Sequence, residues 1–461
     1  MILRYSVMAM MLVGVLGCAS READFTTQAT QISDHTMAQL LAKLMAEPSA
    51  ASSIPNDAPT YLTDLVDIPE LDQYLQHALR HNPSLQQSML ALQIAYAQQG
   101  VSVSEQRPQI EASFTAQEQQ ASQASYTSEI SISWELDLWR KLAASSAAAA
   151  KDIAASQASL QATRDLLAAN IMRNWLEISL HQQLLEIEQR RLAIFENNES
   201  LILGRYRVGL ENLQALDNAK TSTATTHATV AEYRENLAKS QRNLWLLTGQ
   251  WNSTLSQPQV PLSFPAVINP IQRLAPQNMA GRPDLQQAFF NLEAESYRSD
   301  AAYKAMLPSF SLSASVADFG STPSQALFTS PLWSLLGQIS APLFQGGKLK
   351  AQAEMAELTA EQAYWAYQEA LLNAVNEVEN AVGQENALAR QQQHLSAALA
   401  SAERSEQSYE QQYRAGLIDI FDLLTVQRQT YDIAAQLANT TYQRLLNRID
   451  LGLALGLGVA S

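Results

Sequence analysis

Residues 129–151, EISISWELDLWRKLAASSAAAAK, join two hydrophobic patterns without a break. Up to Leu138, apolar and polar residues alternate, which is typical of a β-strand with one apolar and one polar face. After Trp139 the chain becomes rich in alanine, and neither glycine nor proline occurs before Gly204. This favours a single helix of about 65 residues, roughly 100 Å long at 1.5 Å per residue. The stretch therefore predicts a strand that leads directly into a very long helix, the junction that a β-barrel standing on an α-helical tube requires.

Composition excludes several classes of protein. The chain has 461 residues, a net charge of −15 and no block of Lys or Arg, so nucleic acid is not expected as a partner. After residue 20 no apolar run approaches the roughly 20 residues that a transmembrane helix needs. Any membrane crossing is therefore expected to use strands.

The N-terminal segment predicts export and lipidation. Residues 1–17 have the charged start and apolar centre of a signal peptide. Cys18, the only cysteine, closes a Val-Leu-Gly-Cys run that resembles a bacterial lipobox, in which the cysteine carries the lipid and becomes the mature N-terminus. Ala19 follows instead of Asp, which by the same resemblance indicates the outer membrane. The alternative is an ordinary signal with an incidental cysteine. Residues 18–60 are predicted to be the lipid anchor and an extended linker.

The rest of the chain is an internal duplication. Asn-Pro-Ser-Leu-Gln-Gln at 82–87 recurs as Arg-Pro-Asp-Leu-Gln-Gln at 282–287, and Tyr-Arg-Val-Gly-Leu at 206–210 recurs as Tyr-Arg-Ala-Gly-Leu at 413–417. The pattern predicts a first repeat at 61–250, a proline-rich crossover at 251–281 and a second repeat at 282–456. Each repeat is expected to run helix, strand, strand, long helix, turn, helix.

Four strands in one chain cannot close a barrel, and an open edge in lipid leaves backbone groups without hydrogen bonds. Two chains give a barrel of eight strands, and side chains fill the interior of a barrel of this size. Three chains give twelve strands and leave an open passage. The alternative is that the apolar faces of the strands form the core of an ordinary β-sandwich. The residues expected to contact lipid are Ile110, Phe114, Ile130, Ile132, Trp134, Phe310, Leu312 and Ile339.

These features together resemble the TolC-like outer membrane efflux proteins, especially their lipidated branch. The resemblance rests on the duplication, on Leu-Phe-Gln-Gly-Gly-Lys at 343–348 and on the paired Tyr-Arg-x-Gly-Leu turns. It implies an α+β membrane protein: a trimeric, twelve-stranded β-barrel with four strands per chain, continued by a periplasmic α-helical coiled-coil tunnel. It also implies an outer membrane location, a periplasmic adaptor and an inner-membrane pump as partners, and passive efflux of small molecules. A duct for type I polypeptide secretion, or a lipid-anchored coiled-coil scaffold without a pore, are the alternatives.

The resemblance also implies a gate at the periplasmic tip, formed by Tyr413, Asp419 and Asp422 of the second repeat. The alternative is that both aspartates only face solvent near a helix N-terminus, where the dipole favours negative charge. In this family the second-repeat tip has a tyrosine three residues before the turn glycine and aspartates six and nine after it. Tyr413 and Asp422 fit, but the last position is Thr425, so Asp419 is the expected substitute. The basic partner falls at Thr441, with Arg444 one turn away. Adaptor contacts are expected at both tips, although the glycines would be needed for the turns alone. These contacts are Val208, Gly209, Leu210, Ala415, Gly416 and Leu417.

No pattern indicates an enzyme, a metal or a cofactor. His77 and His81 are spaced i, i+4, but no third ligand lies nearby in the sequence, so a solvated helix face is preferred. Gly346-Gly347-Lys348 lacks the upstream glycine and the following Ser or Thr of a phosphate-binding loop, which favours a turn.

Overall fold

The computed structural model describes residues 24–45, 61–66, 71–118, 123–250, 260–261, 263–265 and 281–459. The predicted signal peptide, Cys18 and most of the predicted crossover lie outside these ranges. The chain divides into two compact units, and each takes segments from both sequence repeats. Unit 1 draws on Met1–Gln39, Ser88–Leu160 and Pro283–Leu372, and unit 2 on Leu40–Gln87, Gln161–Arg282 and Asn373–Ser461.

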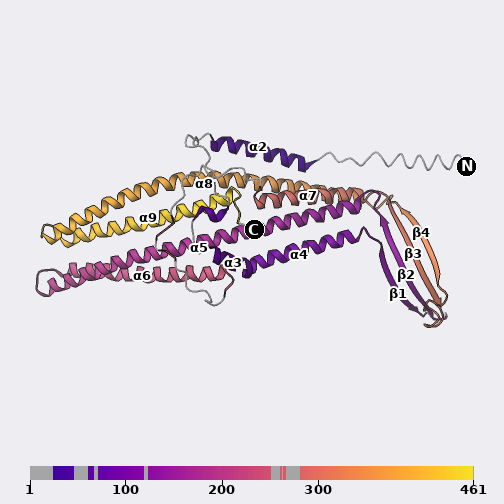
Figure 1. The fold of residues 1–461 in the computed structure, drawn as a ribbon, viewed down its shortest axis with the longest axis horizontal. Coiled ribbons are helices and arrows are strands. Elements are labelled where there is room, and N and C mark those ends of the chain that lie inside the picture. Colours follow the sequence, from indigo (N-terminus) through magenta and orange to yellow (C-terminus); the bar gives the residue numbers. More distant parts are fainter. Residues whose placement is uncertain are drawn as a thin grey trace. The chain divides into compact units, whose positions relative to one another are not determined.

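The helices have the same lengths in both repeats (Figure 1). α4 (Pro83–Ser104) and α7 (Pro283–Lys304) have 22 residues each. α5 (Lys141–Arg207) and α8 (Lys348–Arg414) have 67 each, and α6 (Leu213–Leu247) and α9 (Ile420–Ala454) have 35 each. The duplication and the long helix after Trp139 are therefore confirmed. The remaining helices are α2 (Phe25–Met45), the short 3₁₀ helix η1 (Leu62–Leu65) and α3 (Leu71–His81).

Unit 1 contains one antiparallel sheet in the order β1-β2-β3-β4. Its strands are β1 (Gln109–Gln117), β2 (Ser125–Leu136), β3 (Ser309–Gly320) and β4 (Leu332–Ser340). β2 starts four residues before the predicted alternation and ends two residues earlier, because Leu138 already belongs to the turn that precedes α5. Within the described chain, β1 and β4 each have one neighbouring strand, so each leaves an edge without a hydrogen-bonding partner.

The register places the predicted apolar residues on one face. Residues paired in register lie on the same face, and Ile110 pairs with Ile132, which in turn pairs with Ala314. Trp134 pairs with Leu312, and Phe310 with Ile339. Trp333 and Leu335, which the sequence analysis omitted, extend this face and are 79% and 64% exposed. The other face is rich in serine, and on it the Ser315 and Ser334 hydroxyls lie 3.0 Å apart. The sheet therefore has an uncovered apolar face and a polar face.

Each repeat turns from strand to helix through a residue with positive φ. Arg140 (φ 60°) precedes α5, and Gly347 (φ 86°) takes the corresponding position before α8. The Asp137 carboxylate accepts hydrogen bonds from the backbone N–H groups of Leu142 (3.1 Å) and Ala143 (2.7 Å), which satisfies two free donors of the first turn of α5. The turn predicted for Gly346-Gly347-Lys348 is thus observed, with Lys348 N–H donating to Gln345 O at 3.1 Å.

Part of the predicted extended linker is helical, which corrects the sequence analysis. α2 covers Phe25–Met45 and contains neither glycine nor proline. The Asp24 carboxylate accepts a hydrogen bond from the Thr27 N–H at 3.1 Å, and so supplies the helix start. Pro48, Pro55 and Pro59, which favour an extended linker, all follow α2 in the sequence and lie outside the described residues.

Candidate gate at the helical tips

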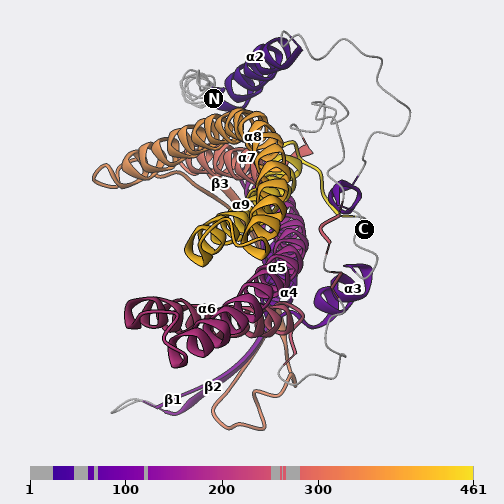
Figure 2. The ribbon, with the colours of Figure 1, turned by 90° about the vertical axis from the view of Figure 1, so that its left-hand side faces the viewer.

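The two helical hairpins of unit 2, α5–α6 and α8–α9, end in the same kind of turn (Figure 2). Gly209 (φ 75°) and Gly416 (φ 69°) have the left-handed conformation that ends many helices. After α5, Gly209 N–H donates to Tyr206 O (3.0 Å) and Leu210 N–H to Arg205 O (2.9 Å). After α8, Gly416 and Leu417 donate to Tyr413 O and Gln412 O, both at 3.0 Å. Both glycines are therefore explained by the turn itself.

The residue that starts each return helix is polar. Asn212 is the N-cap of α6, and its side chain accepts from the Ala215 N–H at 2.8 Å. Asp419 is the N-cap of α9 and accepts from the Phe421 N–H at 3.2 Å. Asp419 therefore precedes the helix instead of lying on its side, and its carboxylate already has a structural use. Asp422 follows in the first turn of α9, and both side chains are exposed.

The predicted adaptor contacts lie at the exposed ends of the hairpins. Val208 and Leu210 are 69% and 68% exposed, and Leu417 is 73% exposed. Isolated exposed leucines are common, but here three large apolar side chains stand on two neighbouring turns. The turn geometry does not require these three side chains to be apolar. They are therefore the best candidates among the tip residues for contact with another protein.

An apolar core just above these turns packs the two hairpins against each other. It is built from Ile202 of α5, residues of α6, and Ile420 and Leu423 of α9. Tyr413 packs against it from α8, so this predicted gate residue is half-buried in the tip core. The other buried members are Ala215, Leu216 and Ala219.

Farther from the tips, an ion pair of Arg191 links the two hairpins. Its guanidinium lies 2.6 Å from Asp432 of α9 and 3.4 Å from Glu188 of its own helix, and 5.6 Å above the Tyr431 ring. Burial raises the pKa of Glu188 despite the nearby Arg191, and Asp432 raises it further. This cluster borders a cavity of about 290 Å³ that residues of α5, α6 and α9 line. Arg191 was not predicted as a functional residue, because an i, i+3 Glu–Arg pair is common in long helices.

Arg444, the basic residue nearest the predicted partner position, is used elsewhere. It donates to Glu385 of α8 (Nε to Oε1, 2.9 Å), and Arg448 donates to the same oxygen at 2.6 Å. Thr441 accepts from Gln392 at 2.9 Å. Asp422 stands 22 residues before Arg444 in α9, which separates them by about 33 Å at 1.5 Å per residue. Arg444 therefore cannot pair with Asp422 within the chain.

The histidine pair is structural. His77 Nδ1 lies 3.1 Å from Thr248 O, and its Nε2 lies 2.9 Å from the Gln250 amide nitrogen. His81 stacks on it with ring centroids 4.3 Å apart. Among the residues that the structure describes, no three His, Cys, Asp or Glu side chains gather as a metal site would require. No helix in the described ranges combines the length and apolarity needed to cross a membrane.

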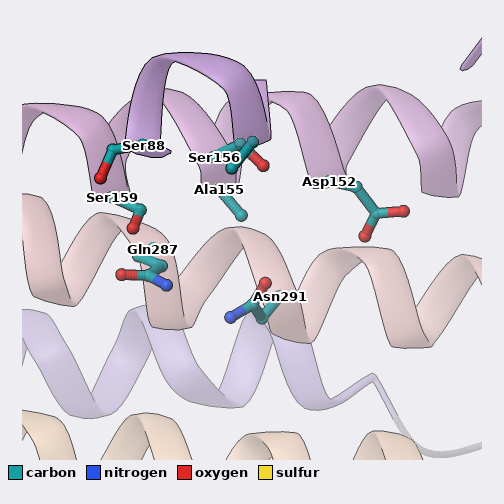
Figure 3. A pocket seen from close by; sticks show the side chains of 8 residues that line it. Ser88, Asp152, Ala155, Ser156, Ser159, Gln287 and Asn291 are labelled. Atoms are coloured by element: carbon teal, nitrogen blue, oxygen red, sulfur yellow. The ribbon is translucent and has the colours of Figure 1, made fainter. Parts of the chain in front are cut away.

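A second hollow, of about 230 Å³, lies in unit 1 between α4, α5 and α7 (Figure 3). Its walls carry short polar side chains, including Ser88, Ser156 and Asn291. Asp152, at one end, forms an ion pair with Arg298 at 2.5 Å. The hollow is a gap in a seam of small residues, and Ala148 and Ala149 of α5 are buried.

Comparison with known proteins agrees with this architecture. The family model "Outer membrane efflux protein" matches residues 74–250 and 274–457, one segment in each repeat. The "Probable outer membrane lipoprotein SilC" of Salmonella typhimurium is 26% identical over 405 residues, 85% of this chain and 86% of the relative. The "Cation efflux system protein CusC" of Escherichia coli (strain K12) is 25% identical over 392 residues, 83% of this chain and 86% of the relative.

Solved structures show the same fold. The Campylobacter jejuni CmeC outer membrane channel superposes with a TM-score of 0.81 at 19% identity, over 89% of this chain and 91% of that chain. The predicted fold class is confirmed, since the chain has the fold of trimeric outer membrane channels and supplies four antiparallel strands. Members of this family are transport channels. The chain belongs to the outer membrane efflux protein family and is an outer membrane efflux channel.

Proposed function

We propose that three copies of this chain close a twelve-stranded barrel in the outer membrane and work with a periplasmic adaptor and an inner-membrane pump. The observation that carries the proposal is the sheet, whose apolar face is uncovered and whose two edges are unpaired within the described ranges. Pairing β4 of one copy with β1 of the next satisfies both edges, and each apolar face then contacts lipid. Native mass spectrometry in detergent should give three chains, and bilayer recordings should show discrete conductance. A mass of one or two chains would contradict the proposal.

The tips are proposed to be the adaptor contact, and the exposed Leu210 and Leu417 support this assignment. Leu210→Asp or Leu417→Asp should abolish export in cells that contain the adaptor and pump, while the trimer still assembles. Gln214→Asp is the matched control, because Gln214 is an exposed polar residue at the start of α6 and should tolerate a charge. Normal export by both leucine variants would leave these residues with no role beyond the turns.

Cys18 is proposed to be the lipidated mature N-terminus. The relative SilC is named an outer membrane lipoprotein, and Cys18 is the only cysteine of the chain. Intact-mass analysis of the purified protein should show a chain that begins at Cys18 and carries acyl groups. An unmodified Cys18, or cleavage at another position, would refute the assignment.

The proposed cargo is a small molecule or ion, and not a polypeptide. The support is the relative CusC, which is named for cation efflux. Disruption of the gene should increase accumulation of small toxic solutes, while polypeptide secretion stays unchanged. The opposite result would favour a secretion duct.

A further inference from the structure

One face of α2 packs against an apolar surface of unit 1 that α7 and α8 form with aromatic residues. Ala29 is fully buried there against Leu292 of α7 and Tyr364 and Tyr367 of α8. The Phe25 and Tyr364 ring centroids are 5.6 Å apart. Apolar side chains at Phe25, Ala29 and Ile32 follow the i, i+4, i+7 spacing of a single helix face. This surface of α7 and α8 is therefore covered by a segment of the same chain.

The start of α2 is fixed by Asp24. Its carboxylate accepts from the Thr26 hydroxyl at 2.6 Å, from the Thr27 N–H at 3.1 Å and from the Thr27 hydroxyl. These hydrogen bonds lower the pKa of Asp24 to about 2, so the cap is ionised at neutral pH. Unwinding the first turn to lengthen the preceding chain would break the cap and withdraw Phe25 from the surface of α7 and α8.

With the sheet in the outer membrane, as proposed above, the strand-to-helix junction lies at the periplasmic surface of the membrane. β4 ends at Ser340, and Leu343 and Phe344 follow it with 94% and 89% of their surface exposed. Trp139 lies at the junction of the first repeat, where its indole N–H donates to Pro308 O at 2.7 Å. Exposed aromatic residues next to lysines are typical of the membrane–water boundary.

The distance from the docked Phe25 to the junction is close to the length of chain between Cys18 and Phe25. Tyr364 stands sixteen residues after Lys348, where α8 begins, so Phe25 docks about 24 Å from the junction along α8. Cys18 is separated from Phe25 by seven peptide links, which span at most about 25 Å. The end of α2 that carries Phe25 points toward the strands (Figure 1). The available chain therefore only just reaches the junction.

We propose that α2 is a strap of matched length, whose docking on α7 and α8 leaves the lipid of Cys18 barely enough chain to reach the membrane surface. This inference rests on the proposed lipidation of Cys18. If the segment between Cys18 and α2 is shortened, the lipid cannot insert in the membrane while α2 stays packed on α7 and α8. The strap thus fixes the lipid anchor to the outside of unit 1.

The test is deletion of residues 21–23, which removes about 10 Å of reach and keeps both Asp24 and the residues next to Cys18. Hydrogen exchange of the α2 amides is measured on the full protein in lipid vesicles. In the lipidated deletion variant, α2 should exchange at least tenfold faster than in the unaltered protein. In the same deletion made with Cys18→Ser, α2 should stay as protected as in the unaltered protein, because no anchor pulls on it.

Two variants serve as controls. Arg21→Ala with Glu22→Ala keeps the length and should keep the protection, and a three-residue insertion after Ala23 should keep it too. Unchanged protection in the lipidated deletion variant would show that the chain is slack and overturn the proposal. Equal loss with and without Cys18 would mean that the deletion damages α2 itself, which also overturns it. An intact mass without lipid would refute the anchor and the strap together, yet leave trimer mass and conductance as separate tests of the channel.

Discussion

The two repeats have helices of equal length but different residues at the positions that matter most for backbone strain and charge. At the strand-to-helix junction the first repeat has Arg140 with φ 60°, where the second has Gly347 with φ 86°. At the tip the first repeat caps its return helix with Asn212, and the second with Asp419. The duplicated backbone has thus kept its geometry while its side chains diverged.

The comparison separates what the fold requires from what one repeat adds. Both tips keep glycine with positive φ, so the turn requires it. The junction tolerates arginine in the first repeat, where Asp137 binds two N–H groups of α5 and supports the turn. The carboxylates at the second tip have no counterpart in the first, because Asn212 and the buried Ala215 stand in their places. A gating role is therefore to be sought in the second repeat.

The largest expected effect concerns Ile132 and its counterpart Ile339. Arginine at either site faces lipid and should cost about 2–4 kcal/mol in the free energy of unfolding, measured by denaturant titration in vesicles. Ile132 lies on a strand with two neighbours, whereas β4, which carries Ile339, is an edge within one chain. Closure of the barrel between chains makes both strands internal, so the two costs should be similar.

Substitutions on the polar face are the control for this prediction. Ser131→Arg and Gln338→Arg occupy the adjacent positions and should be mild, because their side chains point away from lipid. Equal costs on both faces would argue against a barrel. A clearly smaller cost for Ile339→Arg than for Ile132→Arg would argue against pairing of β4 with another chain.

The tip glycines should show the next largest effect. Gly209→Ala and Gly416→Ala should each destabilise the protein by about 1–2 kcal/mol, because alanine is strained at positive φ. Nothing lies within 4 Å of a Cβ added at either site, so the cost is conformational in both repeats. Gly204→Ala is the control, since Gly204 lies inside α5 with equal space and should be stabilised by about 0.5–1 kcal/mol. The melting temperatures of Gly209→Ala and Gly416→Ala should fall by similar amounts. A larger fall in one variant would mean that its tip makes an additional contact.

The strand-to-helix junctions predict effects of opposite sign in the two repeats. Arg140→Gly relieves a left-handed residue and should raise stability by about 0.5–1 kcal/mol, after the entropy cost of glycine is subtracted. Gly347→Ala introduces the same strain as at the tip glycines and should lower stability by about 1–2 kcal/mol. Thermal unfolding of both variants measures the pair. Destabilisation by Arg140→Gly would mean that the arginine side chain makes a contact that outweighs its backbone strain.

Periodicity predicted most of the fold but only part of the candidate site. α5 was predicted because no helix breaker precedes Gly204, and the alternating residues of Gln109–Gln117 form β1. α2 was missed because its sequence has only a weak helical pattern of apolar residues. Its packing against α7 and α8 involves residues far away in the sequence. Arg191 and Glu385 were missed because their partners come from helices distant in the sequence. Such pairings depend on tertiary packing, which local pattern does not contain.

The smallest expected change in stability, and the most informative test of the gate, is Asp419→Asn. Asparagine keeps the oxygen that caps α9, so stability should change by only a few tenths of a kcal/mol, and the second tip then matches Asn212 in the first. If Asp419 and Asp422 line the opening, Asp419→Asn and Asp422→Asn should each reduce cation preference in single-channel recordings, because the opening loses negative charge. Asn212→Asp is the reciprocal variant, and it should leave cation preference unchanged if only the second tip faces the axis. Unaltered conductance and selectivity in both aspartate variants would show that these carboxylates serve the helix N-terminus alone, where its dipole favours negative charge.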